Sequence, residues 1–238
     1  MVGITSAAKT LLLVVVQDVV LAAIVIAIFL TGVFVLRSAG RRVTYSLSSL
    51  GLRRPRNGIL RGVGLGIATG LAGILVETVA NPISVLVLRH FGYSAKSSIQ
   101  QPFMQGLEGW VRQSPGVAIP AMIAVVVLFG PAVEELVFRG AIFNGLYRLG
   151  ALLSSRLRLK RGRGVSFWVA AIVSSSLFAL LHLEPVIFLS IFVLALLLCY
   201  VFFRTGSILT SFAAHATFNS LAVIVIILDG LRVLNLPV

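Results

Sequence analysis

Residues 11–36 have the sequence LLLVVVQDVVLAAIVIAIFLTGVFVL, and this stretch decides the fold class. Its only ionisable side chain is Asp18, and it exceeds the roughly 20 residues that a helix needs to cross ~30 Å of hydrocarbon. Further apolar stretches near or above that length follow at residues 62–88, 117–133, 165–183, 186–203 and 206–228. The sequence therefore predicts an all-α, polytopic transmembrane helix bundle of about six spans.

The composition excludes a water-soluble fold. Hydrophobic residues make up 58% of the 238 residues and charged residues 11%, whereas soluble domains are about half apolar and a quarter charged. No polar stretch is long enough for a second folded core, so we expect one membrane domain. Residues 1–116 would supply N-terminal transmembrane helices and connecting loops, and residues 117–238 would form the helical core.

The formal charge of +13 follows the loops between the apolar segments. Because positively charged loops face the cytoplasm, this pattern predicts cytoplasmic loops after the first and third spans and both termini on the opposite side. Each basic residue near anionic headgroups is worth about 1 kcal/mol, so the lipid bilayer explains the charge and no nucleic acid is expected as a partner. The basic residues of these two loops are Arg37, Arg41, Arg42, Arg53, Arg54, Arg56 and Arg61, then Arg148, Arg156, Arg158, Lys160, Arg161 and Arg163.

Small residues recur along the second span. Since glycine lets helices approach closely in a membrane, this pattern predicts a helix that packs in the bundle interior. The glycines concerned are Gly62, Gly64, Gly66, Gly70 and Gly73.

A few ionisable or strongly polar side chains interrupt the apolar segments of the second half. Each charged group there costs roughly 2.5–3.5 kcal/mol on insertion scales, so each needs a partner, a wet cavity or a function. They fall into three short motifs with a spacing of four residues: Glu134, Glu135 and Arg139 in PAVEELVFRG, Phe178 and His182 in FALLH, and His215 and Asn219 in HATFN.

The spacing suggests how these groups divide their roles. Residues four apart share a helix face, so Glu135 and Arg139 are predicted to form a structural ion pair. Glu134 points about 100° away and is the candidate general base for an attacking water.

The two histidine motifs would complete the site. His182 would orient the water together with Glu134, and His215 with Asn219 would donate hydrogen bonds to an oxyanion. Phe178 would pack against the site and exclude bulk water.

Other polar groups have plainer interpretations. A single histidine in a membrane helix is more often a packed, hydrogen-bonded residue than a catalyst. Asp18, beside Gln17, is interpreted as an interhelical hydrogen-bonding contact or part of a polar path, outside the catalytic set. Glu184, between two spans, is interpreted as a solvated turn residue that is close enough to tune His182.

The three motifs together resemble those of the CAAX protease and bacteriocin-processing family of intramembrane proteases, which includes the type II CAAX prenyl endopeptidases. The resemblance covers about residues 117–225, while the first two spans match the family only in being membrane helices. It implies that the helical core of residues 117–238 surrounds an intramembrane catalytic cavity. It also implies hydrolysis of a peptide or membrane-anchored protein, either prenylated CAAX-type or bacteriocin-related. The resemblance also implies a location in a bacterial plasma membrane.

The resemblance leaves the mechanism and the class of function open. Related proteins are often labelled metalloproteases, but this chain has no HExxH motif, so we favour a metal-free glutamate mechanism without a cofactor. Zinc is the alternative if Glu134, His182 and His215 converge as ligands.

The competing class is a noncatalytic transporter, proton path or immunity-type binding protein. A proton path would spread titrating groups across the membrane, whereas hydrolysis requires them to converge on one water.

Overall fold

The computed structural model describes residues 2–38, 47–93 and 101–234, and these residues form helices and no strands. Six helical stretches are long and apolar enough to span a membrane, which confirms the predicted polytopic bundle. Outside the third span, the helices are α1 (Val2–Ser38), η1 (Leu47–Leu50), α2 (Ile59–His90), α3 (Gln101–Gln113), α7 (Gly162–Leu180), α8 (Phe188–Thr205) and α9 (Ile208–Gly230).

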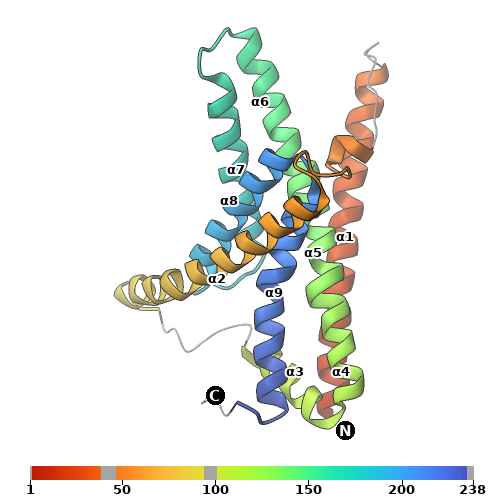
Figure 1. Ribbon diagram of the computed structural model, residues 1–238, viewed down its shortest axis with the longest axis vertical. Coiled ribbons are helices and arrows are strands. Elements are labelled where there is room, and N and C mark those ends of the chain that lie inside the picture. Colours follow the sequence, from red (N-terminus) through yellow and green to blue (C-terminus); the bar gives the residue numbers. More distant parts are fainter. Residues whose placement is uncertain (1, 39–46, 94–100, 235–238) are drawn as a thin grey trace.

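The bundle is elongated, as Figure 1 shows. Helices α1 and α9 and the third span run along its long axis, α2 crosses them obliquely, and α7 and α8 pack in one half. The start of α1 and the end of α9 lie at the end of the molecule opposite to the link between α6 (Asn144–Arg156) and α7. These helix ends and this basic link have the relative placement that the charge pattern predicted.

The third span contains the apolar stretch at residues 117–133 and continues beyond it as one helical run, Pro115–Arg156. Two π-helical segments interrupt its α-helical geometry. The run consists of α4 (Pro115–Met122), the π-helical η2 (Ile123–Phe129), α5 (Gly130–Glu135), the π-helical η3 (Leu136–Phe143) and α6.

The first π-helical segment explains why Pro131 does not break the third span. A proline ring clashes with the carbonyl of residue i−4 in an α-helix, and the wider π-helical turn relieves such crowding. Phe129 and Gly130 accordingly keep right-handed helical dihedral angles directly before Pro131.

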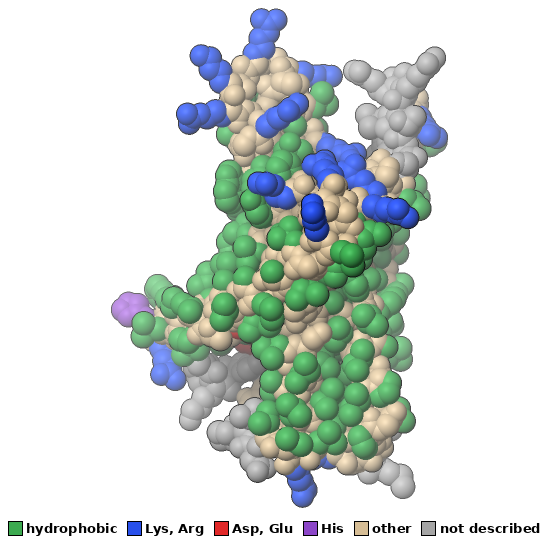
Figure 2. Space-filling model, viewed as in Figure 1, with side chains coloured by type: hydrophobic (Ala, Val, Ile, Leu, Met, Phe, Trp, Pro, Cys, Tyr) green, Lys and Arg blue, Asp and Glu red, His purple; other side chains and the backbone are tan. Residues whose placement is uncertain are grey.

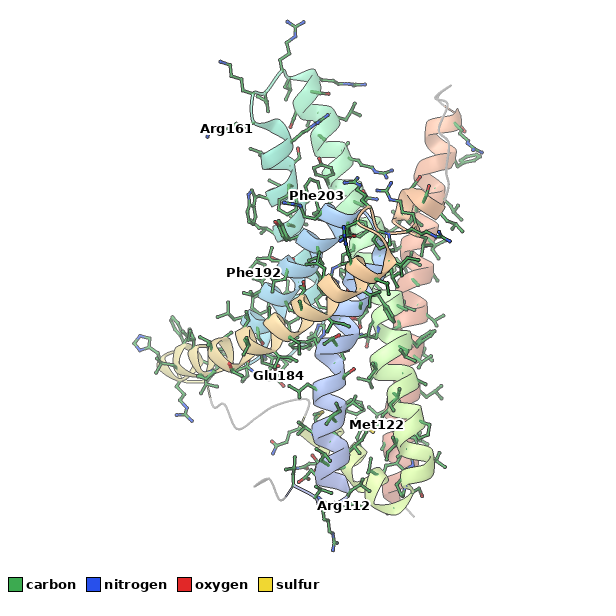
Figure 3. All side chains as sticks on the ribbon, viewed as in Figure 1. Arg112, Met122, Arg161, Glu184, Phe192 and Phe203 are labelled. Carbon is green, nitrogen blue, oxygen red and sulfur yellow. The ribbon has the colours of Figure 1, made fainter. Side chains whose placement is uncertain are left out.

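Basic side chains gather at one end of the molecule, over a surface that is elsewhere largely apolar (Figure 2). In Figure 3, Arg161 lies at this end and Arg112 at the other. Arg41 and Arg42, which the charge argument included, lie outside the described residues.

The segment before α2 is fixed to the α8–α9 turn, because Arg53 Nε donates to the carbonyl oxygen of Gly206 at 2.7 Å.

The glycines of α2 divide into two groups. Gly62, Gly66, Gly70 and Gly73 are buried, and α2 packs through this face against α8 and α9. At Gly66, a Cβ atom would lie 2.5 Å from the carbonyl oxygen of Thr210 in α9. Gly64 is exposed and would place its Cβ in open space, so the prediction of close packing is wrong for this residue.

We predict that Gly66→Ala lowers the free energy of unfolding by about 1–3 kcal/mol, because the new methyl group meets backbone that cannot rotate away. Gly64→Ala on the same helix is the matched control, and it should be neutral or stabilising by up to about 1 kcal/mol. Thermal unfolding in detergent measures both variants. Equal effects of the two substitutions would contradict the close α2–α9 contact.

Candidate active site

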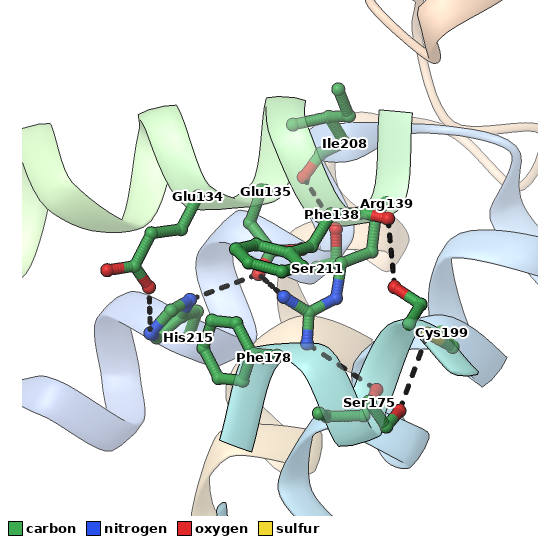
Figure 4. Close-up of polar contacts among 12 residues, drawn as sticks. Glu134, Glu135, Phe138, Arg139, Ser175, Phe178, Cys199, Ile208, Ser211 and His215 are labelled. Carbon is green, nitrogen blue, oxygen red and sulfur yellow. Dashed lines mark hydrogen bonds and ion pairs between the residues drawn. The ribbon is translucent and has the colours of Figure 1, made fainter. Parts of the chain in front are cut away.

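The centre of the site is the imidazole ring of His215, which lies between two carboxyl groups (Figure 4). Its Nδ1 lies 3.0 Å from Oε1 of Glu135, and its Nε2 lies 3.6 Å from Oε2 of Glu134. A carboxylate can only accept a hydrogen bond, so the proton on Nδ1 is donated to Glu135. This bond fixes the ring and turns Nε2 toward Glu134, at a separation somewhat longer than a hydrogen bond.

Glu135 and Arg139 form the ion pair that their spacing predicts. Nη1 of Arg139 lies 2.9 Å from Oε1 of Glu135, and both side chains are almost completely buried. Arg139 reaches from η3 toward α8, where its Nη2 approaches the carbonyl oxygen of Ala195 at 3.4 Å. A buried pair of this kind is costly to break, because removal of one partner leaves the other charge uncompensated.

Three polar side chains of the site, those of Arg139, His182 and His215, contact the ring of Phe178 in α7. The guanidinium carbon of Arg139 lies 4.6 Å above the centre of its ring, a cation–π contact. The rings of His182 and His215 lie 4.8 and 5.6 Å from the same ring, centre to centre. Phe178 is buried, as the expectation that it shields the site requires.

His182 is brought to the site through Phe178. Its Nδ1 lies 2.8 Å from the carbonyl oxygen of Phe178, one turn earlier, so Nδ1 carries the proton and Nε2 can accept a hydrogen bond. Within the described part of the chain, His182 forms no ion pair with Glu134. The structure therefore places both histidines around one aromatic ring but brings only His215 directly to the glutamates.

Asn219 is positioned by a gap in the backbone hydrogen bonds of the third span. Gly130 donates its N–H to Val125, so the carbonyl of Val126 would pair next with residue 131. Pro131 has no N–H. The side-chain nitrogen of Asn219 donates to Val126 instead, at 2.9 Å. An amide nitrogen carries two hydrogens, so one N–H of Asn219 remains for another acceptor.

The zinc alternative requires three ligands that point at one position. Within the described ranges, no three His, Cys, Asp or Glu side chains are arranged to hold a metal ion. Nδ1 of both histidines is engaged, by Phe178 in one case and Glu135 in the other, which leaves Nε2 of each as the nitrogen that could bind a metal ion. The zinc alternative therefore stays a prediction.

Two acidic residues differ from their interpretation in the sequence. Glu184 is buried, 5% exposed, so its assignment as a solvated turn residue is wrong; Figure 3 shows it near the middle of the long axis. Asp18 is also buried, and its Oδ2 has no hydrogen-bond partner among the described residues, unlike an interhelical hydrogen-bonding contact. A Cβ atom on Gly130, four residues before Glu134, would lie 3.4 Å from Oδ2 of Asp18, which places Asp18 beside the site. The sequence signal for this position was that Asp18 is the only ionisable residue in the first apolar stretch.

The fold and the site define a class: an integral membrane helix bundle with buried glutamate, arginine and histidine side chains near its middle. Residues 116–221 match the family described as "Type II CAAX prenyl endopeptidase Rce1-like", and this range contains all three motifs. The match confirms the family resemblance that the motifs predicted.

The chain is also similar to a bacterial protein, "Putative membrane peptidase YdiL" of Bacillus subtilis (strain 168). The two are 25% identical over 170 residues, which cover 71% of this chain. The aligned region spans about 60% of the relative's length. No solved structure matches the chain.

We predict that Arg139→Met lowers the free energy of unfolding by about 3–5 kcal/mol, because it leaves Glu135 buried without its cation. The double variant Arg139→Met/Glu135→Leu should lose less than the sum of the two single changes, since it removes both charges. Arg204→Met, at an exposed arginine of α8, is the control and should change stability little. Additive losses in thermal unfolding would show that the two residues are not coupled.

Proposed function

We propose that this protein is an intramembrane endopeptidase that hydrolyses peptide bonds with a water activated by Glu134. The observation that carries the proposal is the position of Glu134: its carboxyl group faces a histidine whose opposite nitrogen is held by a second, arginine-paired glutamate. General bases are commonly found in such a setting, within reach of groups that stabilise developing charge.

Buried polar side-chain atoms without a hydrogen bond support the entry of water at this site, and one of them, Nη1 of Arg139, meets Glu135 only as an ion pair. In the described ranges, all of these side-chain atoms except Oγ1 of Thr210 belong to Asp18, Glu135 and Arg139. Buried polar groups are nearly always hydrogen-bonded, so a concentration of unpaired ones favours a place that admits water or a polar substrate group.

The proposed reaction assigns each residue a role. Glu134 takes a proton from water as the oxygen attacks the carbonyl carbon, and His182 accepts a hydrogen bond from that water through Nε2. The second N–H of a protonated His215, on Nε2, and the remaining N–H of Asn219 stabilise the oxyanion. The carbon–nitrogen bond then breaks, and the proton held by Glu134 passes to the leaving nitrogen.

The proposed substrate is a peptide or membrane-anchored protein, with prenylated CAAX-type and bacteriocin-related sequences as the two candidate classes, and the proposed location is a bacterial plasma membrane. The matched family and the relative from Bacillus subtilis support a membrane peptidase, through the words of their names. The mechanism proposed is the metal-free one.

We predict that Glu134→Gln lowers kcat for peptide cleavage by about 10²–10⁴-fold, because the amide cannot take up the proton of water. Glu77→Gln is the matched control, since Glu77 lies on α2 and accepts a hydrogen bond from Asn81 of the same helix. The assay uses the purified protein in detergent with a fluorogenic prenylated CAAX peptide and a mixed peptide library.

Treatment of the wild type with a chelator completes this assay. Activity that survives the chelator and is lost in Glu134→Gln supports the metal-free mechanism. Activity that the chelator abolishes and zinc restores would contradict it. If the wild type cleaves no peptide, a binding or transport function becomes the better proposal.

Asn219→Ala should lower kcat by about 10²–10³-fold, because one oxyanion donor is lost. Ser220→Ala is the control, since the Ser220 hydroxyl bonds only within its own helix, to Ala216 at 2.6 Å. Thermal unfolding is measured in parallel, because Asn219→Ala also removes the partner of the Val126 carbonyl. An active Asn219→Ala protein would exclude Asn219 as an oxyanion donor.

A further inference from the structure

Asp18 is a buried acid that the reaction proposed above does not use. It is 3% exposed, and its Oδ2 is enclosed without a hydrogen-bond partner among the described residues. An ionised carboxyl group in such surroundings costs stability unless a cation or hydrogen-bond donor compensates it. A residue with this cost and no visible structural bond calls for a functional explanation.

The inward face of α1 brings Asp18 to the site. Leu21, Ala22 and Val25 lie three, four and seven residues after Asp18, so all four share one side of the helix. These three side chains pack against the apolar cluster that contains Phe138 and Phe178. The packing of α1 against Phe138 and Phe178 thus also sets the position of Asp18.

The absence of a side chain at Gly130 in the third span leaves room for the carboxyl group of Asp18. A Cβ atom on Gly130 would lie 3.4 Å from Oδ2 of Asp18, so the acid rests against the backbone of α5. Gly130 precedes Glu134 by four residues, which places both on one helix face, about one turn apart. Asp18 therefore approaches the same side of α5 from which Glu134 projects.

The charged groups around Asp18 make its charge relevant to Glu134. The helices that pack against α1 near this point carry two carboxyl groups, on Glu134 and Glu135, and one cation, on Arg139. Arg139 is already paired with Glu135. When ionised, Asp18 repels the carboxylate of Glu134 and attracts a protonated His215.

We propose that Asp18 is a third acidic residue of the site, a positioning residue that acts through its negative charge on Glu134 and His215. The proposal rests on the function proposed above. Repulsion between the Asp18 and Glu134 carboxylates is relieved when Glu134 takes up the proton of the attacking water, so the charge of Asp18 favours that step. The effect belongs to catalysis and not to substrate binding, because Asp18 is sealed from the surface.

The test replaces Asp18 with its neutral isostere, Asp18→Asn, in the full-length protein in detergent. At the few ångström that separate neighbouring groups, loss of one charge should lower kcat by about tenfold or more, with KM within about twofold of the wild type. Asp18→Glu keeps the charge and should retain more activity than Asp18→Asn. Gln17→Leu, at the exposed neighbouring position, is the matched control and should leave kcat unchanged.

Thermal unfolding supplies a readout that does not depend on activity. Removal of an uncompensated buried charge should raise the melting temperature of Asp18→Asn, by about 2–4 °C or more. A lower melting temperature would overturn the proposal, since it would show that Asp18 stabilises the fold through a bond. A wild-type kcat in Asp18→Asn would overturn it as well.

The failure of the proposed function would look different. In that case the wild type cleaves no peptide, whereas a raised melting temperature of Asp18→Asn still reports an uncompensated charge at this position. A lower kcat together with a higher melting temperature supports both the function and the role of Asp18.

Discussion

A glutamate and an arginine lie 2.9 Å apart in the middle of an apolar helix bundle, and this pair anchors the imidazole ring of His215 at the centre of the site. In low dielectric surroundings neither charge is tolerable alone. Arg139 is therefore held by Glu135, by the ring of Phe178 and by the carbonyl of Ala195. Three helices that are separate in the sequence are fixed together by one guanidinium group.

The same pair orients the groups proposed to act on substrate. Oε1 of Glu135 forms the ion pair with Arg139 and accepts a hydrogen bond from Nδ1 of His215, so the ring of His215 has only one nitrogen left to face Glu134. Glu134 and Glu135 thus have different environments although they are adjacent in sequence. One is committed to structure, and the other meets a histidine at a distance that leaves it without a formed hydrogen bond. Two neighbouring carboxyl groups with divergent surroundings are a common basis for a division of roles in catalysis.

The backbone geometry of the third span also positions the residues of the site. The short α-helical segment that carries both glutamates lies between two π-helical segments, a distortion that is frequent at functional sites. Pro131 withholds one backbone donor, and Asn219 fills the resulting gap at Val126. The motif PAVEELVFRG thereby positions a residue of α9 as well as its own charges. The family match covers these elements, whereas Asp18 lies on a helix that precedes the matched region.

The sequence by itself determined the membrane-spanning class, the six long apolar helices, the Glu135–Arg139 pair and the family resemblance, because each depends on composition or on spacing along one helix. Tertiary structure alone decided that His215 turns both nitrogens toward glutamates, that Phe178 gathers two histidines, and that Asp18 belongs beside the site. It also decided that Glu184 is buried and that Gly64 has no packing role. These features depend on which faces of distant helices pack together. Helical periodicity shows which residues share a face, but it does not show which other helix that face contacts.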